Sequence, residues 1–248
     1  MSTEPGWPEG YDRIVLRTVD STNAEAARLA PELGRPTWIM AEEQQAGRGR
    51  RGTVWRMPAG NLAASLILRP TGTAGWAALR SFMAANALYE TLALYVDRTR
   101  LGLKWPNDVL LDGGKVAGIL LEAAGSGGAV DWLIVGVGVN LAAVPDGVTD
   151  AAFPPICLAD AGARATPEDF LLRLAGFYAT EESILEQLGF QPIREKWLRG
   201  AARLGEEITA RTPQGETRGR FRIIDEAGRL VLETPQGEVR IAAAEVFF

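Results

Sequence analysis

One predicted β-hairpin carries charged residues whose types and spacing could bind or activate a small ligand. Within residues 104–122, two apolar runs typical of strands flank Gly113-Gly114, a pair that favours a tight two-residue turn. Lys115 directly follows this turn, and Asp108 lies on the same side of the sheet because side chains alternate along a strand. Four residues of strand place the two charges about 13 Å apart. This separation is too long for an ion pair and suits the two ends of a ligand.

The same charges have an ordinary structural explanation. A lone aspartate and a lysine in a hairpin are usually solvated residues on the outer face of an amphipathic ribbon. Here Lys104 and Asn107 accompany Asp108 and Lys115, while the other positions of the hairpin are largely apolar. Four such groups on one apolar hairpin favour a binding or catalytic site.

A second candidate for chemistry is the segment 44–52, Gln-Gln-Ala-Gly-Arg-Gly-Arg-Arg-Gly. Its glycines let the backbone approach an anion closely, and Arg48, Arg50 and Arg51 supply charge and bidentate donors. The segment favours phosphate binding but lacks the Gly-x4-Gly-Lys-Ser/Thr pattern of a P-loop. Because no acidic residue separates its arginines, we expect residues 47–54 to be mobile without ligand and to order over it.

Polar residues also precede the first predicted helix. Asp20-Ser-Thr-Asn23 leads into residues 24–30, which are strong helix formers. Thr22 and Glu25 have capping-box spacing, and a helix cap is the interpretation that these residues favour when taken alone. The alternative is that the helix start offers hydrogen bonds to a small polar ligand.

A nearly uninterrupted apolar strand is predicted over residues 130–141, as expected for a strand buried on both faces. Gly136 and Gly138 share one of those faces and leave it without side chains. Close approach of a ligand and close packing of a helix explain the two glycines equally well. Asn140 continues on the same face, where it could recognise a polar edge.

Histidine is absent from the 248 residues, and Cys157 is the single cysteine. The chain therefore has no Ser-His-Asp or Cys-His nucleophile, no zinc site that needs imidazole and no intramolecular disulfide. An enzyme of this composition must work through carboxylates, lysine, arginine, backbone amides or a bound metal. Catalysis by positioning and by fixed charge fits that inventory.

The overall composition is that of an ordinary globular protein with a net charge of −5. This charge argues against a protein built to bind nucleic acid. No uncharged run approaches membrane-spanning length, and the N-terminus has neither the basic end nor the apolar segment of a signal peptide. We expect a cytoplasmic protein with no nucleic-acid or membrane partner, either a monomer or a weak homodimer.

The remaining pattern predicts an α/β (α+β) chain in two parts. The first, residues 1–203, begins with a loose arm over 1–12 and alternates strands with helices, the longest of which is expected as one helix over 75–96. Short strands separated by turn residues follow from 204 to 248 and predict a small β-barrel, which should pack on the larger part because it is too small to be stable alone. The expected strands are 13–19, 36–42, 61–68, 101–105 and 130–141, and the other helices are 24–30, 167–188 (with Thr166 as N-cap) and 192–199.

Taken together, these motifs resemble the bacterial biotin protein ligases, the biotin–[acetyl-CoA-carboxylase] ligases. The resemblance spans residues 20–140 in the family's order, and it implies a mixed-sheet biotin/lipoate ligase-like catalytic domain followed by an SH3-like barrel. Some family members carry an N-terminal DNA-binding module, for which a first strand near residue 13 leaves no room. The matching segments are Asp20-Ser-Thr-Asn23, Gln44–Gly52 with Trp55, Lys104-Trp-Pro-Asn-Asp108, Lys115–Glu122 and Gly136-Val-Gly-Val-Asn140.

The resemblance also implies a reaction in two steps. Biotin, as substrate, attacks the α-phosphate of ATP through its carboxylate and gives biotinyl-5′-AMP and pyrophosphate, with Mg²⁺ accompanying ATP. A lysine of a biotin carboxyl carrier protein, part of acetyl-CoA carboxylase or a related carboxylase, then attacks the adenylate. No enzyme nucleophile is needed, so the lack of histidine is no obstacle.

Matching positions imply a role for each motif residue. The biotin-binding residues would be Ser21, Thr22, Asn23, Gln44, Arg48, Gly49, Arg50, Lys115 and Gly118, the first four at the ureido end. The residues at ATP and the adenylate would be Arg50, Trp55, Lys104, Asn107, Lys115 and Asn140. Lys115, Arg48, Arg50 and Asp108 would be catalytic, Lys115 by neutralising charge and Asp108 by positioning the reacting groups. No dedicated metal site of the protein is expected.

One position departs from the family pattern. The family loop usually continues Gly-Arg-x-Trp, whereas this chain has Gly52-Thr53-Val54-Trp55. Without an arginine at position 53, we expect weaker binding of the triphosphate but the same type of reaction.

Two other functions compete with biotin ligation. A lipoate or octanoate ligase or transferase would share the fold, but the transferase needs a nucleophilic cysteine and Cys157 lies outside every motif. A biotin-sensing regulator without ligase activity is disfavoured by the acidic charge and by the missing DNA-binding module.

Overall fold

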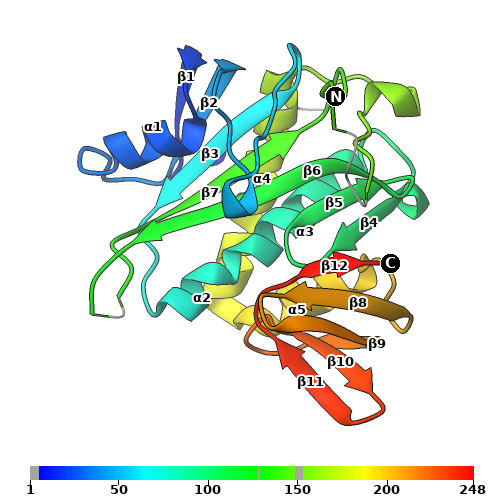
Figure 1. Ribbon diagram of the computed structural model, residues 1–248. Coiled ribbons are helices and arrows are strands. Elements are labelled where there is room, and N and C mark those ends of the chain that lie inside the picture. Colours follow the sequence, from blue (N-terminus) through cyan, green and yellow to red (C-terminus); the bar gives the residue numbers. More distant parts are fainter. Residues whose placement is uncertain (1–5, 128, 149–152) are drawn as a thin grey trace.

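A seven-stranded mixed sheet forms the centre of the protein, which is described here by a computed structural model over residues 6–127, 129–148 and 153–248 (Figure 1). Only β1 and β2 are parallel, and α1 connects them; all other neighbours are antiparallel. This confirms the predicted α/β chain with a mixed sheet. Part of the predicted N-terminal arm, residues 1–5, lies outside the described residues. In sheet order the strands are β1 (Asp12–Val19), β2 (Thr37–Gln44), β3 (Leu62–Leu68), β7 (Trp132–Val139), β6 (Gly114–Ala124), β5 (Asp108–Leu111) and β4 (Leu101–Lys104).

Each central strand serves two apolar layers because successive side chains point to opposite faces of the sheet. Ile39 in β2 packs with Ala26 of α1 (Thr22–Leu29) on one face. Its neighbours Trp38 and Met40 belong to the larger core on the other face, which the remaining helices cover (Figure 1). These helices are α2 (Ala74–Ala78), α3 (Arg80–Leu92), α4 (Pro167–Leu188) and α5 (Phe190–Arg199), and short 3₁₀ turns cover Arg50–Gly52, Arg98–Arg100 and Ala159–Ala161.

The single helix predicted over 75–96 is wrong, because the chain forms α2 and α3 with a break between them. Leu79 separates the two helices, and the bonds on either side of it join residues three apart. The next residue, Arg80, is buried and pairs with Glu182 of α4. A local apolar spacing that continues across Leu79 does not reveal this change in backbone hydrogen bonding.

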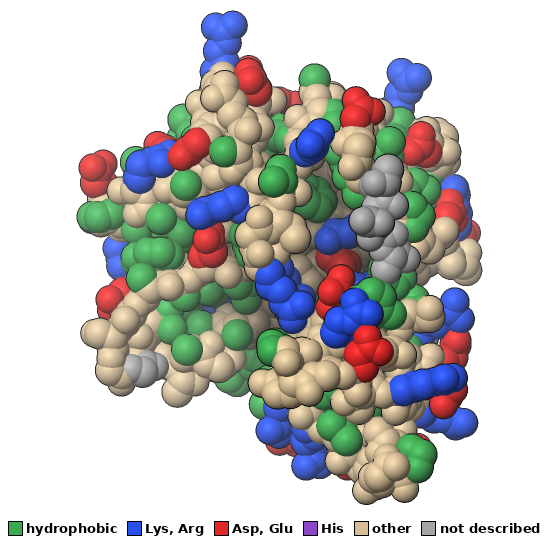
Figure 2. Space-filling model, in the orientation of Figure 1, with side chains coloured by type: hydrophobic (Ala, Val, Ile, Leu, Met, Phe, Trp, Pro, Cys, Tyr) green, Lys and Arg blue, Asp and Glu red, His purple; other side chains and the backbone are tan. Residues whose placement is uncertain are grey.

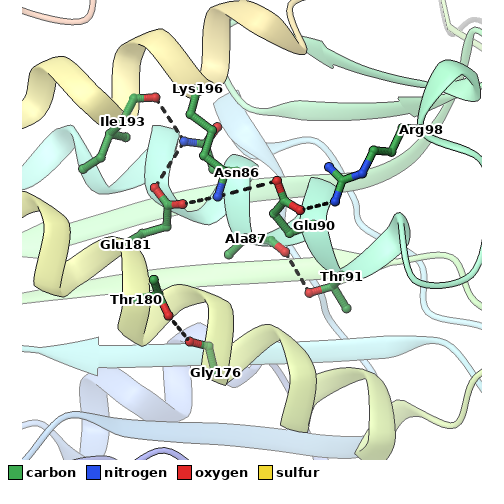
Figure 3. Close-up of polar contacts among 10 residues, drawn as sticks. All are labelled: Asn86, Ala87, Glu90, Thr91, Arg98, Gly176, Thr180, Glu181, Ile193 and Lys196. Carbon is green, nitrogen blue, oxygen red and sulfur yellow. Dashed lines mark hydrogen bonds and ion pairs between the residues drawn. The ribbon is translucent and has the colours of Figure 1, made fainter.

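A buried polar network joins α3, α4 and α5 (Figure 3). The amide nitrogen of Asn86 donates to Glu181 at 3.2 Å and to the carbonyl of Ile193 at 3.1 Å. Lys196 donates to the same Glu181, a carboxylate that is only 1% exposed, at 2.6 Å. Because a buried carboxylate is stable only with charged and hydrogen-bonding partners, this network fixes the helices behind the sheet.

The C-terminal residues form the predicted small β domain, with five antiparallel strands in the order β11-β10-β9-β8-β12. It lies beside α5 and the β4–β5 edge of the large sheet (Figure 1). None of the described helices is long and apolar enough to cross a membrane. The domain boundary at residues 203 and 204 stays a prediction. The strands are β8 (Glu207–Thr212), β9 (Gly215–Ile224), β10 (Leu230–Thr234), β11 (Gly237–Ile241) and β12 (Glu245–Phe247).

Aromatic residues join the two domains. The indole nitrogen of Trp105 donates to the carbonyl of Gly228 at 3.1 Å, and Trp197 lies 6.4 Å from Phe221 between ring centroids. Phe82 of α3 contacts the Gly228 turn so closely that a side chain there would overlap its ring. The β domain therefore covers apolar surface of the larger domain.

Deleting residues 204–248 should make the remaining protein aggregate and lose activity. The deletion exposes Trp105, Trp197 and Phe82, and large exposed apolar patches promote association. Soluble yield and light scattering of the 1–203 fragment measure this effect. Arg218→Ala, on the exposed face of the β domain, is the control and should stay soluble. A soluble, monomeric fragment with full activity would contradict the prediction.

Candidate active site

A cavity of about 340 Å³ opens on the same face of the sheet as α1, within the size range of small-molecule sites. Figure 2 shows the hollow, with basic and acidic side chains gathered beside it above the C-terminal domain. Every predicted site residue except Asn140 lines this cavity: Ser21, Thr22, Asn23, Gln44, Arg48, Gly49, Arg50, Trp55, Lys104, Asn107, Asp108, Lys115 and Gly118.

One end of the cavity is neutral and polar. The carboxyl ends of β1 and β2 lie side by side because these strands are parallel, which brings Thr22 next to Gln44. Gln44 Oε1 accepts from the backbone N–H of Thr22 at 2.9 Å and from its hydroxyl at 3.3 Å. Ser65 of β3 lies 2.8 Å from the Thr22 hydroxyl and donates to Asn23 Oδ1 at 2.6 Å. These groups form a preorganised set of neutral donors and acceptors.

The favoured interpretation of Thr22 as a helix cap is wrong. The N-cap position is Ser21, and its side chain makes no capping hydrogen bond. Thr22 is the first helical residue, and its hydroxyl donates to Gln44 and accepts from Ser65 instead. A partner from a distant strand, which local spacing does not reveal, replaces the predicted capping box.

Glu122 of β6 links this neutral end to the Gly/Arg loop. Asn23 Nδ2 donates to Glu122 at 2.7 Å, and Arg48 lies 3.4 Å from the other oxygen of that carboxylate. Glu122 thereby sets the orientation of the Asn23 amide, since Ser65 holds the amide oxygen. Glu122 ends the Lys115–Glu122 motif, but its spacing alone indicates no role.

The two glycines of β7 make room for the protein's own site residues. A Cβ atom on Gly136 would overlap the amide of Asn23, and one on Gly138 would overlap the indole of Trp55. The explanation by close helix packing is confirmed at Gly136, because Asn23 belongs to the helix packed on this strand. Close approach of a ligand to these glycines stays a prediction. The bare face of β7 allows side chains of the site to lie directly on the sheet.

The predicted register of the hairpin is wrong by two residues next to the turn and by one residue at Asp108, which pairs with Gly118. Its turn is Asp112-Gly113, with φ of 49° and 80°, the positive values that a tight hairpin turn requires. Leu110 pairs with Lys115 because Val116 is an extra residue in the ladder. Lys115 then lies two residues, or about 7 Å, from Asp108 along the sheet, a gap that its side chain spans.

Asp108 is consequently the centre of an ion-pair cluster and not one end of a ligand site. The residue Asp108 is 8% exposed. Its carboxylate lies 2.6 Å from the ammonium of Lys115 and 3.2 Å from that of Lys104. Burial alone would raise the pKa of Asp108, but the Lys115 and Lys104 charges outweigh it and hold that pKa below its usual value. Burial also lowers the pKa of Lys104. Asp108 therefore stays charged and holds two ammonium groups at the cavity.

The Gly/Arg loop forms a closed turn in which every arginine has a partner. Gly49 donates its N–H to Thr53 at 2.7 Å, and Trp55 donates its N–H to Gly47 at 2.9 Å. Arg50 donates to Asn107 Oδ1 at 3.1 Å, while Arg51 lies 4.0 Å from Glu245. Mobility of this loop without ligand stays a prediction.

Trp55 and Lys115 form the floor beside Gly118. The Lys115 ammonium lies 5.6 Å from the centroid of the Trp55 ring, and both side chains would crowd any Cβ atom added at Gly118. This arrangement is a cation–π contact, which aligns the ammonium with the ring face. The Lys115 ammonium is thus held by two contacts, an ion pair with Asp108 and a cation–π contact with Trp55.

Asn140 supports the cavity from behind. Its amide nitrogen donates to the carbonyls of Ile156 at 3.2 Å and Lys115 at 3.4 Å, and the residue is buried. The side chain therefore fixes the backbone at Lys115. Its predicted contact with the adenylate stays a prediction.

Several residues in or beside the cavity were not predicted from the sequence. Ser65 contacts Thr22 and Asn23 without lining the cavity, and it could have been found as the only hydroxyl in an otherwise apolar strand. No local signal marks Ala244 or Glu245 in the C-terminal domain, which do line it. Cys157 is 2% exposed and does not line the cavity. Burial and a hydrogen bond to Asp160 raise its thiol pKa, so this cysteine is unsuited to nucleophilic transfer.

Comparisons with known proteins agree with this geometry. Residues 15–140 match the model of the biotin/lipoate A/B protein ligase family, and residues 204–248 match the biotin protein ligase C-terminal domain. The chain is 53% identical to the biotin–[acetyl-CoA-carboxylase] ligase of Paracoccus denitrificans, over 94% of this chain and 99% of that protein. It is 31% identical to the bifunctional ligase/repressor BirA of Escherichia coli, over 97% of this chain and 77% of that one.

A solved structure agrees in fold as well. The biotin protein ligase of Aquifex aeolicus in complex with biotin and ATP superposes with a TM-score of 0.79 at 25% identity, over 95% of this chain and 98% of that one. These matches cover both parts of the chain, and the motifs behind them line one cavity. The chain belongs to the biotin/lipoate A/B protein ligase family.

Proposed function

We propose that the protein is a biotin ligase that forms biotinyl-5′-AMP from biotin and ATP and transfers biotin to a lysine of a biotin carboxyl carrier protein. The observation that carries this proposal is the polarity of the cavity, neutral at the α1 end and cationic at the hairpin end. Biotin has a neutral ureido head and an anionic carboxylate, and its adenylate continues in a phosphate. A ligand of that polarity fits the cavity in one orientation. The similar Paracoccus ligase and the Aquifex complex with biotin and ATP support the same activity.

The neutral end would bind the ureido head of biotin. Thr22, Asn23 and Gln44 present alternating donors and acceptors there, and Ser21 lies beside them at the start of α1. Gly118 would let the biotin chain pass close to β6. Because the polar groups already hold one another, little reorganisation is needed when the ligand binds.

The cationic end would assist attack of the biotin carboxylate on the α-phosphate. Both groups are anionic, so their approach requires positive charge between them. Lys115 would supply that charge, and the loop residues Arg48, Gly49 and Arg50 would close over the carboxylate and phosphate. Asp108 would act by holding the Lys115 ammonium in place. Pyrophosphate would then leave with the electron pair of the broken P–O bond.

The remaining motif residues would hold the nucleotide. Trp55 would flank adenine, Lys104 and Asn107 would contact the adenylate, and Asn140 would act through the backbone at Lys115. Among the described residues no cluster of acidic, cysteine or histidine side chains could hold a metal, and Asp108 is already paired with two lysines. Mg²⁺ would therefore arrive with ATP, bound by phosphate oxygens and water.

The acceptor would be the carrier domain of acetyl-CoA carboxylase or a related carboxylase. The reaction would take place in the cytoplasm. The enzyme would act as a monomer or weak homodimer, without nucleic acid or membrane.

Transfer of labelled biotin to a purified carboxylase carrier domain tests the function directly. The expected result is ATP-dependent label on the carrier lysine, with pyrophosphate released in the first step. Lipoate and octanoate serve as competing substrates. Preferential use of either acid would show the related ligase activity instead.

Lys115→Ala should slow adenylate formation. We expect the activation free energy of this step to rise by about 3–4 kcal/mol, by analogy with loss of one preorganised donor in other enzymes. It should also cost stability, since the buried Asp108 loses one of two charged partners. We expect a loss of about 1–3 kcal/mol in unfolding free energy. Pyrophosphate release and thermal unfolding of the same preparation measure both effects.

Lys196→Ala is a matched control for this variant. Its ammonium also lies 2.6 Å from a buried carboxylate, and the exposed side-chain fractions are alike, 28% for Lys196 and 31% for Lys115. Lys196 lies behind the sheet, so its loss should lower stability and leave the folded enzyme's adenylation rate within a factor of about two. Similar adenylation rates in the two variants would make Lys115 a structural residue.

Two alanine substitutions in β7 should separate the ends of the site. Gly136→Ala displaces the amide of Asn23 and should weaken biotin binding, whereas Gly138→Ala displaces the Trp55 indole and should weaken nucleotide binding. We expect about tenfold or more in each affected dissociation constant, because overlap with a packed group forces it to move. Calorimetry with biotin and with ATP measures the two constants. If both variants weakened biotin binding and ATP binding equally, the assignment of one end of the cavity to biotin and the other to the nucleotide would be wrong.

Thr53→Arg should tighten ATP binding, because Thr53 lines the cavity where the family usually carries arginine. A charge-assisted contact contributes roughly 1.5–3 kcal/mol when fully formed, and less at an exposed position. Thr53→Gln also loses the hydroxyl bond to the Arg50 carbonyl but adds no charge, which makes it the control. An ATP dissociation constant equal in the two variants would mean that this position points away from the phosphates.

A further inference from the structure

The C-terminal domain delivers one carboxylate to the mouth of the cavity. In β12, Val246 is buried in the β domain opposite Ala210, so Glu245 points the other way because side chains alternate. Glu245 and Ala244 line the cavity together with residues of the catalytic domain. The Glu245 side chain is 53% exposed and therefore accessible from solvent.

Positive charge dominates the rest of the cavity. Five cationic side chains line it, but in the described parts of the chain only two carboxylates do so, Asp108 and Glu245. Asp108 is buried and occupied by two ammonium groups. Glu245 is thus the acidic group that an approaching molecule meets first. The cationic residues are Arg48, Arg50, Arg51, Lys104 and Lys115.

This charge distribution suits the first step and opposes the second. The cations hold anionic substrates, but the acceptor lysine arrives as an ammonium group that they repel. We propose that Glu245 receives the ammonium of the acceptor lysine at the cavity mouth and guides it to the adenylate. This inference rests on the proposed ligase function and adds a specificity residue for its second step.

The present partner of Glu245 can be displaced easily. Arg51 lies 4.0 Å away, and both side chains are about half exposed, a kind of ion pair that contributes little to stability. An incoming ammonium can therefore replace Arg51. The charge of Glu245 also reaches into the site, where it opposes the lowering of the pKa values of Lys104 and Arg50 that burial causes.

The covalent step is balanced without an added reactant. The ammonium loses one proton to water at the open mouth, and its nitrogen lone pair attacks the carbonyl carbon of the adenylate. A C–N bond forms, the C–O bond to phosphate breaks, and AMP leaves with that electron pair. The nitrogen loses its second proton to water as the amide forms. Glu245 guides the cation and takes no part in bond breaking.

Two small acceptors distinguish attraction of a cation from other effects. Full-length enzyme is given preformed biotinyl-5′-AMP and either Nα-acetyl-lysine amide, which is cationic, or hydroxylamine, which is largely uncharged near neutral pH. In Glu245→Gln the ratio of the lysine rate to the hydroxylamine rate should fall about tenfold, the size of effect that one charge contact produces. Glu245→Asp should restore part of that ratio. Added salt should lower the ratio in the wild type more than in Glu245→Gln.

Arg51→Gln is the matched control, because it removes the other half of the same ion pair. It frees Glu245, so the ratio should rise. An unchanged ratio in Glu245→Gln, or an equal fall in Arg51→Gln, would overturn the proposal and leave Glu245 as a partner of the loop. Failure of the wild type to form adenylate or pass biotin to hydroxylamine would instead refute the ligase function on which this inference rests.

Discussion

The site depends on a single buried carboxylate held between two lysines. A charge at the position of Asp108 is costly unless it is paired, and the ammonium groups of Lys104 and Lys115 supply the pairing. The same contact keeps two flexible lysine side chains at one point on three adjacent strands. Fixed positive charge is what a reaction between two anions requires. In the proposed reaction this charge would be in place in advance, so the side chains would not need to reorganise.

The cavity also requires glycines on β6 and β7. Without side chains at Gly136, Gly138 and Gly118, the Asn23 amide and the Trp55 indole can lie directly on the sheet. Strands alone would offer only a flat apolar surface. The helix start and the loop supply the polar groups, and the bare strands let these groups approach. The antiparallel pairing of β6 and β7 sets Gly118 opposite Gly138, so neither strand has a side chain at this point.

Motif residues could be predicted from the sequence because their chemical types are unusual for the strands and loops that carry them. Their contacts could not. The Asp112-Gly113 turn and the extra residue Val116 changed the register, which turned a predicted separation into an ion pair. Thr22 found a partner on β3, and Glu245 arrived from another domain. Register, long-range hydrogen bonds and domain docking depend on tertiary packing, which local spacing does not encode.

The long strand β6 runs along the cavity from its cationic end to its neutral end. The Lys115 side chain reaches Gly118, and Asn23 bonds to Glu122 further along the same strand. Four residues of extended chain span about 13 Å, and a hydrogen-bonded strand can neither stretch nor shorten. β6 therefore sets a fixed distance between the two ends of the site. If the cavity binds biotin as proposed, an acid with a shorter or longer chain would reach the polar end or the cationic end, but not both at once.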